Sequence, residues 1–273
     1  MQERPFFSVI IPTFNRCSIV RLAIESVLSQ TFSDFQLIVV DDGSQDGSGE
    51  MIKREFKNRL TYIYQENRGP AAARNTGLKE ARGRFICFLD SDDRFRKEKL
   101  ELAYTYIKKY PQYKIFHTEE IWYRRGKFLE HKKKHLKPQG NVFRDALKLC
   151  CISISTAVIK QDVFDRIGKF DEDFPVCEDY EFWLRAAAVY KVKLIPKVLT
   201  IKEGGRKDEL SQRKGLDRYR ALAVKKLIDN FPLAVQQKKY AREELKRKIA
   251  IYVQGAQKRG KDQEAEELLR LAE

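Results

Sequence analysis

Phe85-Ile86-Cys87-Phe88-Leu89-Asp90-Ser91-Asp92-Asp93 is an apolar run that ends in a cluster of carboxylates. The run has the length and composition of a buried strand, and the aspartates follow at its carboxyl end, where open α/β sheets bind their ligands. Carboxylates two residues apart can share a divalent cation, and Mg²⁺ held in this way usually completes its shell with phosphate oxygens. The stretch therefore predicts an α/β fold with a metal-diphosphate site. Aspartates also cap helices and fill turns, so a purely structural role stays open.

A second apolar run, residues 35–40, also ends in aspartates. Asp41 and Asp42 are followed by a Gly-Ser turn at 43–44. An Asp-Gly pair can mark a hairpin, but no second strand follows. The apolar positions within 51–56 have the period of an amphipathic helix. This unit is therefore a strand, an acidic turn and a helix.

Two further segments repeat the alternation of strand and helix. Residues 7–12 form a β-rich run stopped by a proline, and a helical pattern follows over 19–27. A short strand at 62–64 precedes the segment 67–77, which begins a helix rich in small residues. Small residues permit close approach of the backbone, and Arg74 offers a planar set of donors suited to phosphate.

In their order and spacing, these four segments resemble the inverting family 2 glycosyltransferases of the GT-A fold, over about residues 7–205. The resemblance implies a Rossmann-like, nucleotide-binding mixed sheet flanked by helices. It also implies that the acidic turn after residue 40 holds uracil and ribose, and that the stretch 67–77 closes over a nucleotide-sugar donor. The implied donor-binding residues are Pro12, Thr13, Phe14, Asn15, Asp41, Asp42, Asn67, Gly69, Arg74, Asp90 and Ser91. The implied ligands for Mn²⁺ or Mg²⁺ are Asp92 and Asp90.

The resemblance extends to residues 167–185, where a Gly-x-Phe-Asp-Glu pattern precedes the pair Glu178-Asp179. In the family, the Asp of this pair usually takes the acceptor proton. Asp179 is therefore the implied catalytic base, with Glu178 as the alternate. Acidic residues here could also simply favour the positive N-terminus of a helix whose apolar face carries Phe182 and Trp183. The two roles are compatible.

The implied mechanism places a metal and a base on opposite sides of the sugar. Asp179 accepts the proton of an acceptor hydroxyl that attacks the anomeric carbon, while the metal neutralises the departing diphosphate. Asp41 is expected to accept the N3–H of a uracil or thymine base. Many relatives carry a His after the catalytic helix, whereas no His follows His135 in this chain. The candidates for phosphate contact in its place are Lys202, Arg206 and Lys207.

Length and composition fit one catalytic domain with an appendage. The chain has 273 residues, of which 42% are hydrophobic. We expect a catalytic domain at 1–205, with a donor half at 1–120 and an acceptor half at 121–205, and a basic helical extension at 206–273. The sequence lacks an apolar run of the roughly 20 residues that span a membrane, and its start lacks an apolar leader. We therefore expect a cytoplasmic protein, peripheral at most at the inner face of the membrane. Five cysteines without a Cys-x-x-Cys pair indicate reduced thiols.

Positive charge is concentrated in two segments. Residues 123–148 hold 9 Lys or Arg and 2 acidic residues, and residues 205–273 hold 18 and 11. Such segments favour contact with an anionic membrane surface or an acidic acceptor, or they are solvated faces. His131 and His135 have the spacing of metal ligands on a helix, but the lysines between them would repel a cation. Apolar stripes in the last segment predict helices that pack on the catalytic domain or on a second subunit, as in a homodimer.

Taken together, the sequence predicts transfer of a sugar, with a UDP-sugar favoured, to a hydroxyl of a glycan, lipid-linked or other acceptor in cell-surface polysaccharide or glycolipid synthesis. Two alternatives stay open. A sugar-nucleotide nucleotidyltransferase would share the fold and the metal, but it should have a glycine-rich basic loop where this chain has residues 12–15. A non-catalytic nucleic-acid-binding protein would use the net charge of +15, but it would not need acidic clusters at the ends of strands and helices.

Overall fold

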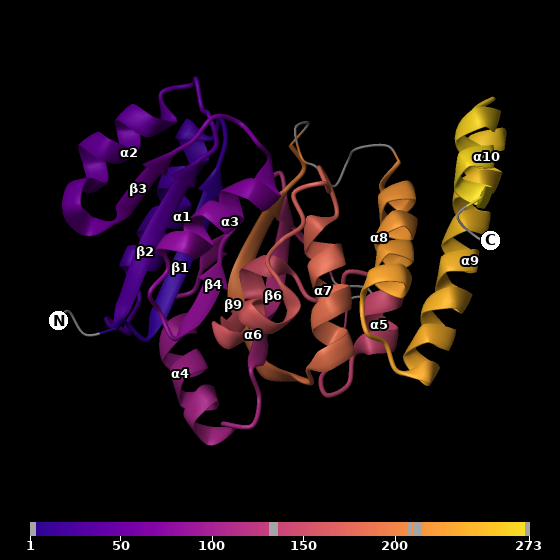
Figure 1. The fold of residues 1–273 in the computed structure, drawn as a ribbon. Helices are drawn as coiled ribbons and strands as arrows, with labels where there is room; N and C mark the ends of the chain where they lie inside the picture. Colours follow the sequence, from indigo (N-terminus) through magenta and orange to yellow (C-terminus); the bar gives the residue numbers. More distant parts are fainter. Residues whose placement is uncertain (1–3, 131–135, 207–208, 210–214, 271–273) are drawn as a thin grey trace.

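A mixed β-sheet with helices on both faces forms the centre of the molecule, and further helices extend it at the C-terminal side (Figure 1). The structure is a computed structural model that describes residues 4–130, 136–206, 209 and 215–270. Its strands are β1 (Phe7–Thr13), β2 (Phe35–Asp41), β3 (Thr61–Tyr64), β4 (Phe85–Phe88), β5 (Arg94–Phe95), β6 (Ile115–Arg124), β7 (Lys127–Leu129), β8 (Val158–Lys160) and β9 (Val192–Gly204).

The helices alternate with these strands in the first half of the chain, as predicted. They are α1 (Cys17–Leu28), α2 (Ser48–Phe56), α3 (Pro70–Glu80), α4 (Lys99–Lys109), α5 (Phe143–Lys148), α6 (Asp162–Ile167), α7 (Glu178–Val189), α8 (Leu216–Asn230), α9 (Val235–Gln257) and α10 (Asp262–Leu269). Short 3₁₀ turns lie at Lys57–Arg59 and Ile154–Thr156.

The order of the strands creates a crevice at one edge of the sheet. The order is β3-β2-β1-β4-β8-β6-β9-β5, and β7 pairs with β6. Strands β3, β2, β1 and β4 are parallel, whereas β8 runs antiparallel to β4. The chain moves outward from β1 to β2 and β3 and then returns to place β4 on the other side of β1. Ligands bind outside the carboxyl ends of strands at such a reversal.

Alternation along β1 sends its side chains into two cores. Val9 and Ile11 are buried with α1, α2 and α4 on one face of the sheet, whereas Ile10 is buried with α3 and α7 on the other. Strands covered on both faces read as continuous apolar runs, which is why the strands of the first half were visible in the sequence.

The C-terminal helices continue the second of these cores. Val224 of α8 and Leu245 of α9 belong to the same buried cluster as Trp183 of α7. The prediction of tail helices that pack on the preceding domain is therefore confirmed. Leu22 of α1 and Leu269 of α10, which belong to the apolar patterns of 19–27 and of the last segment, are exposed. The buried faces of these helices carry other residues, among them Ile24 of α1 and Leu268 of α10.

Two features of the composition are also visible in the structure. All five cysteines lie in described residues, and none forms a disulfide. Within the described ranges, no helix has both the length and the apolar character needed to cross a bilayer.

Candidate active site

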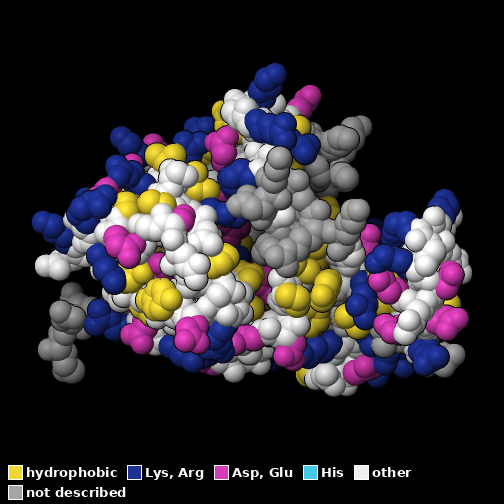
Figure 2. Space-filling view, turned by 90° about the horizontal axis from the view of Figure 1, so that it is seen from above, with side chains coloured by type: hydrophobic (Ala, Val, Ile, Leu, Met, Phe, Trp, Pro, Cys, Tyr) yellow, Lys and Arg dark blue, Asp and Glu magenta, His cyan; other side chains and the backbone are white. Residues whose placement is uncertain are grey.

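The sequence-predicted donor residues meet at the carboxyl edge of the parallel strands. Thr13 ends β1 and residues 14–16 follow it, Asp41 ends β2 and Asp42 follows it, residues 67–69 follow β3, and Asp90 to Asp93 follow β4. Figure 2 views the molecule from this side. Because the strands are parallel and adjacent, segments far apart in the sequence converge on one crevice.

The turn after β1 is tied to the turn after β2. The side chain of Asn15 accepts a hydrogen bond from the backbone N–H of Gln45 at 2.8 Å, and the backbone N–H of Asn15 donates to Ser44 Oγ at 2.8 Å. Asn15 has a φ of 51°, in the left-handed region that Asn tolerates well. Phe14 is exposed beside it, and Thr13 Oγ1 is buried without a hydrogen-bond partner in the described structure.

Asp41 is buried and holds the turn between β2 and α2. Its Oδ1 accepts the backbone N–H of Ser44 at 2.9 Å, and its Oδ2 accepts the hydroxyl of Tyr62 at 2.8 Å. A Cβ at Gly49 would lie 2.5 Å from the Tyr62 hydroxyl and 3.2 Å from Asp41 Oδ2, so the glycine leaves room for this pair. Burial and the bond to Asp41 raise the pKa of Tyr62 well above its usual range, and its hydroxyl stays a donor.

Asp42 organises the loop between β3 and α3. Its Oδ1 accepts Gln65 Nε2 at 2.7 Å and the backbone N–H of Arg68 at 2.9 Å, and its Oδ2 accepts the backbone N–H of Gly69 at 2.8 Å. The side chain of Asn67 donates to the Asp42 carbonyl at 2.9 Å. The structure thus places Asp42 and Asn67 in contact with each other, and both shape the loop that precedes α3.

The carboxylates after β4 form a compact cluster. Ligand oxygens of Asp90, Asp92 and Asp93 lie within 4.8 Å of one another. Mg²⁺ and Mn²⁺ prefer oxygen ligands, and one or two carboxylates with phosphate oxygens usually hold Mg²⁺, so these residues fit a divalent metal. Asp93, which the sequence had not assigned to the metal, belongs to this cluster.

Basic side chains already neutralise the cluster. Lys202 Nζ lies 2.6 Å from Asp93 Oδ2 and 3.8 Å from Asp90 Oδ2, and Arg206 pairs with Asp92 Oδ2. Burial raises the pKa of Asp93 to about 7 despite the Lys202 charge, and burial with the neighbouring Asp90 charge raises the pKa of Asp92. At Asp90 burial acts in the same direction, but the charges of Arg74 and Lys202 hold its pKa below the usual range. The three carboxyls therefore differ in basicity although they are neighbours.

Arg74 joins the donor edge to α7. Its Nη2 lies 2.9 Å from Asp90 Oδ1 and its Nη1 lies 2.5 Å from Glu178 Oε1. The guanidinium also lies 5.5 Å from the centre of the Phe170 ring. Burial opposes the charge of Arg74, but Glu178 and Asp90 raise its pKa, so it stays charged. The sequence had assigned this side chain to phosphate, whereas the structure shows both Nη atoms on carboxylates.

Glu178 and Asp179 begin α7 but have different surroundings. Glu178 is buried against Arg74, whereas Asp179 is half-buried and accepts the thiol of Cys150 on Oδ2 at 3.4 Å. The preceding residue, Cys177, has a φ of 64°, a strained conformation for a residue other than glycine. Acidic residues thus stand at the N-terminus of α7, as the structural role requires, and Asp179 is the more accessible of the two.

A buried polar network behind the cluster was not apparent from the sequence. Ser155 Oγ donates to Asp93 Oδ2 at 2.6 Å and accepts the backbone N–H of Asp90 at 3.1 Å, and Lys99 Nζ donates to the Ser155 carbonyl at 2.8 Å. Further along, Lys137 Nζ lies 2.8 Å from Glu120 Oε1, with both side chains buried. These contacts join residues far apart in the chain. The sequence offers one local sign of them, which is that polar residues occur within otherwise apolar segments.

Some predictions lie outside the described residues. These are the predictions for His131, for His135, for Lys132 to Lys134 and for Lys207.

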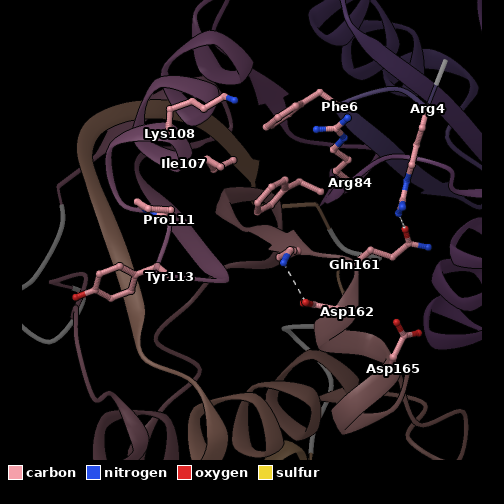
Figure 3. Close-up of a pocket in the computed structure, with 12 residues that line it drawn as sticks. Arg4, Phe6, Arg84, Ile107, Lys108, Pro111, Tyr113, Gln161, Asp162 and Asp165 are labelled. Atoms are coloured by element: carbon pink, nitrogen blue, oxygen red, sulfur yellow. Dashed lines mark hydrogen bonds and ion pairs between the residues drawn. The ribbon is translucent and has the colours of Figure 1, made fainter.

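A cavity of about 510 Å³ lies at the other end of β4 from the acidic cluster (Figure 3). Its lining includes Phe6, Arg84 and Phe85, which stand at the starts of β1 and β4. Because Asp90 follows the opposite end of β4, this cavity is separate from the donor edge.

Comparisons with known proteins agree with this geometry. Residues 8–168 match the family described as Glycosyl transferase family 2. A protein of Escherichia coli named UDP-Glc:alpha-D-GlcNAc-diphosphoundecaprenol beta-1,3-glucosyltransferase WfgD is 34% identical over 184 residues, which cover 65% of this chain and 68% of that protein. An uncharacterised glycosyltransferase of Rickettsia felis is 36% identical over 195 residues, which cover 71% of this chain and 32% of that protein. The chain thus spans about a third of the length of some curated relatives.

The fold also has solved counterparts. The structure of S. aureus TarS 1–349 in complex with UDP-GlcNAc matches with a TM-score of 0.70 and 22% identity, over 88% of this chain and 70% of that chain. This likeness shows the predicted GT-A fold, a mixed sheet flanked by helices with further helices at the C-terminus.

Proposed function

The chain belongs to glycosyl transferase family 2, and from that premise we propose that it transfers a sugar from a UDP-sugar to an acceptor hydroxyl with inversion at the anomeric carbon. The observation that carries the proposal is the bridge made by Arg74, which binds Asp90 at the donor edge and Glu178 at the start of α7. One buried cation thereby fixes the helix that bears Asp179 beside the carboxylates expected to hold the donor. Membership of the family favours this reaction over nucleotidyl transfer and over nucleic-acid binding.

We propose that the nucleotide lies over the turns after β1 and β2. Asp41 has one hydrogen-bond partner on each oxygen, and a carboxylate oxygen can accept more than one donor. It can therefore still receive the N3–H of uracil, with Phe14 and Thr13 beside it. Asp42 has three donors on its carboxylate, and we assign it to the shape of the covering loop at Asn67 and Gly69.

Asp90 and Asp92 are the proposed ligands for Mn²⁺ or Mg²⁺, with Asp93 beside them. A bound metal would supply positive charge to the departing diphosphate. Lys202 and Arg206 lie against the same carboxylates, and we propose that they face the diphosphate from the end of β9, in the place of the His that many relatives carry. Ser91 completes the donor edge next to them.

We assign the general base to Asp179. Glu178 is held by Arg74 in a buried ion pair, so its carboxylate is committed to positioning that guanidinium. Asp179 has no basic partner among the described ion pairs and is partly accessible. As the acceptor hydroxyl attacks from the face opposite the diphosphate, its proton passes to Asp179. General-base help of this type contributes about 10² to 10⁴ in rate.

The acceptor is proposed from the relatives. The name of the E. coli relative describes transfer to a lipid-linked sugar, and we propose an acceptor of this class, a glycan or a lipid-linked glycan for cell-surface polysaccharide or glycolipid synthesis. Residues 1–120 would form the donor half and residues 121–205 the acceptor half, with 206–273 as an extension. We place the reaction on the cytoplasmic side of the membrane.

The test is release of UDP from UDP-sugars by the purified protein in the presence of Mn²⁺ and a set of lipid-linked and free glycans. The proposal expects release that depends on one acceptor class and is lost in Asp179→Asn. A well-folded protein that neither binds nor cleaves any nucleotide sugar would refute it.

A further inference from the structure

A cluster of basic side chains stands at the start of α9, on the edge of the molecule away from the sheet (Figure 1). Lys238, Lys239, Arg242 and Lys246 follow one another on successive turns, and among the described ion pairs none involves these four residues. By contrast, Arg247 and Lys248 of the same helix both pair with Glu244. These four cations, which have no acidic partner among the described ion pairs, are therefore available to an external anion.

Apolar side chains accompany this basic cluster. Val235, in the first turn of α9, is 90% exposed. Together with Leu233 and the four basic residues, it lines a hollow of about 360 Å³, in which Glu243 is the one acidic side chain. An exposed, branched apolar side chain is not stabilised by contact with water. Beside lysines, it can insert into a lipid bilayer at the boundary between headgroups and acyl chains.

From these two observations we propose that the start of α9 docks on an anionic phospholipid surface. Basic residues close to such a surface each strengthen binding roughly five-fold, about 1 kcal/mol. The neighbouring face of α9 packs on the rest of the protein through Leu245, Ile249 and Tyr252. The helix backbone is thus held in place before any surface is bound, which lowers the cost of ordering the basic residues on binding.

The same features disfavour other occupants. In a symmetric dimer, the same patch meets itself, so four cations would face four cations. Binding to a single-stranded nucleic acid uses exposed aromatic rings on which bases stack, whereas Tyr240 on this part of α9 lies under Arg144, with the guanidinium 4.5 Å from its centre.

The proposal goes beyond the transfer reaction, and its test needs neither donor nor acceptor. The full chain is sedimented with vesicles of phosphatidylcholine alone or mixed with phosphatidylglycerol, at low and at high salt. We expect strong binding to the mixed vesicles that weakens with salt, and little binding to phosphatidylcholine. Replacing Lys238, Lys239, Arg242 and Lys246 by Gln should weaken binding to mixed vesicles at least about ten-fold.

A matched variant controls for net charge. Lys53, Arg54, Lys57 and Lys79 are four exposed basic residues on the donor half, and their replacement by Gln removes the same charge while binding should stay within about two-fold. Val235→Ser should reduce the part of the vesicle binding that persists at high salt. Melting curves of every variant will show whether it is folded.

Three results would overturn the proposal. The first is an absence of binding by the wild-type protein to mixed vesicles, and the second is equal loss in the two charge variants. The third is a change only in RNA binding or in oligomeric state when the α9 residues are replaced. If the variant with the four α9 residues replaced loses vesicle binding but keeps its affinity for UDP, membrane docking and the proposed transfer reaction depend on different parts of the protein.

Discussion

Arg74 Nη1 donates to Glu178 Oε1 at 2.5 Å, and the two side chains are only 6% and 7% exposed. Arg74 lies in α3, the helix after β3, and Glu178 lies in the first turn of α7. This ion pair therefore joins the donor edge to the helix that bears the proposed base. Arg74 also binds Asp90 at 2.9 Å. One guanidinium thus serves both sides of the crevice, and its loss would leave Glu178 without its cation and Asp90 with only the more distant Lys202.

The first prediction concerns this buried pair. Arg74→Met should lower the free energy of unfolding by about 3–5 kcal/mol, because it leaves buried negative charge unpaired. Adding Glu178→Gln should recover part of the loss. Urea unfolding measures both effects. The control is Arg94→Gln, which breaks a pair with Glu203 that is about one third exposed and should cost less than about 1 kcal/mol. Equal losses at the two sites would contradict the role given to Arg74.

The second prediction separates chemistry from binding. Asp179→Asn should reduce sugar transfer by about 10² to 10⁴ and leave the affinity for UDP nearly unchanged, because the base acts on the acceptor. Transfer rate and UDP titration are measured on the same preparation. If the variant keeps most of its rate, Asp179 is not the base, and Glu178 or Asp173 would be considered next. Asp173 is 90% exposed and lies 3.8 Å from Lys226.

The third prediction concerns the metal. UDP should raise the melting temperature in Mn²⁺ and much less in EDTA, because Asp92 can reach a diphosphate only through a cation. Ligand at 100 times its Kd stabilises a protein by about 2.7 kcal/mol. Asp92→Asn should remove the part of the shift that depends on Mn²⁺. An equal shift in EDTA would show that Lys202 and Arg206 suffice for the diphosphate.

The fourth prediction concerns the contribution of His117 to stability in mild acid. His117 is fully buried, and its Nε2 donates to the Pro138 carbonyl at 2.8 Å. Burial, together with the Lys137 charge, lowers its pKa from 6.5 to about 4. Between these values the unfolded chain binds a proton and the folded protein does not. The contribution of His117 to the free energy of unfolding should therefore fall as the pH drops from 6.5 to 4, by at most about 3 kcal/mol.

The variant His117→Gln tests this assignment, because Gln can still donate to the carbonyl but does not titrate. Relative to this variant, the wild-type protein should lose free energy of unfolding as the pH falls over that window. Glu120 adds a separate loss at lower pH. Burial opposes its charge, but Lys137 lowers its pKa from 4.5 to about 2, so its contribution disappears as the pH falls from 4.5 to 2. An unchanged slope in His117→Gln between pH 6.5 and 4 would contradict the buried neutral imidazole.

The first four strands and first three helices of the donor half could be predicted because each is specified by local pattern. Apolar runs that are buried on both faces stay visible as runs, and the acidic turns that end β2 and β4 follow directly from them. The order of those motifs also indicated the family and the fold that the comparisons show. These features depend on residues close to one another in the chain, so the sequence alone determined them.

What the sequence left open was the partner of each charged side chain. Arg74 is suited to phosphate by chemistry, yet it lies between Asp90 and Glu178 because α7 packs against α3. Asp42 belongs to the same turn as Asp41, yet the return of the chain after β3 places three donors on it. Lys202 and Asp93 meet only because β9 and the turn after β4 reach the same edge of the sheet. The tertiary structure decided these pairings, because an ion pair depends on distance in space, and no local pattern records which distant segment will supply the opposite charge.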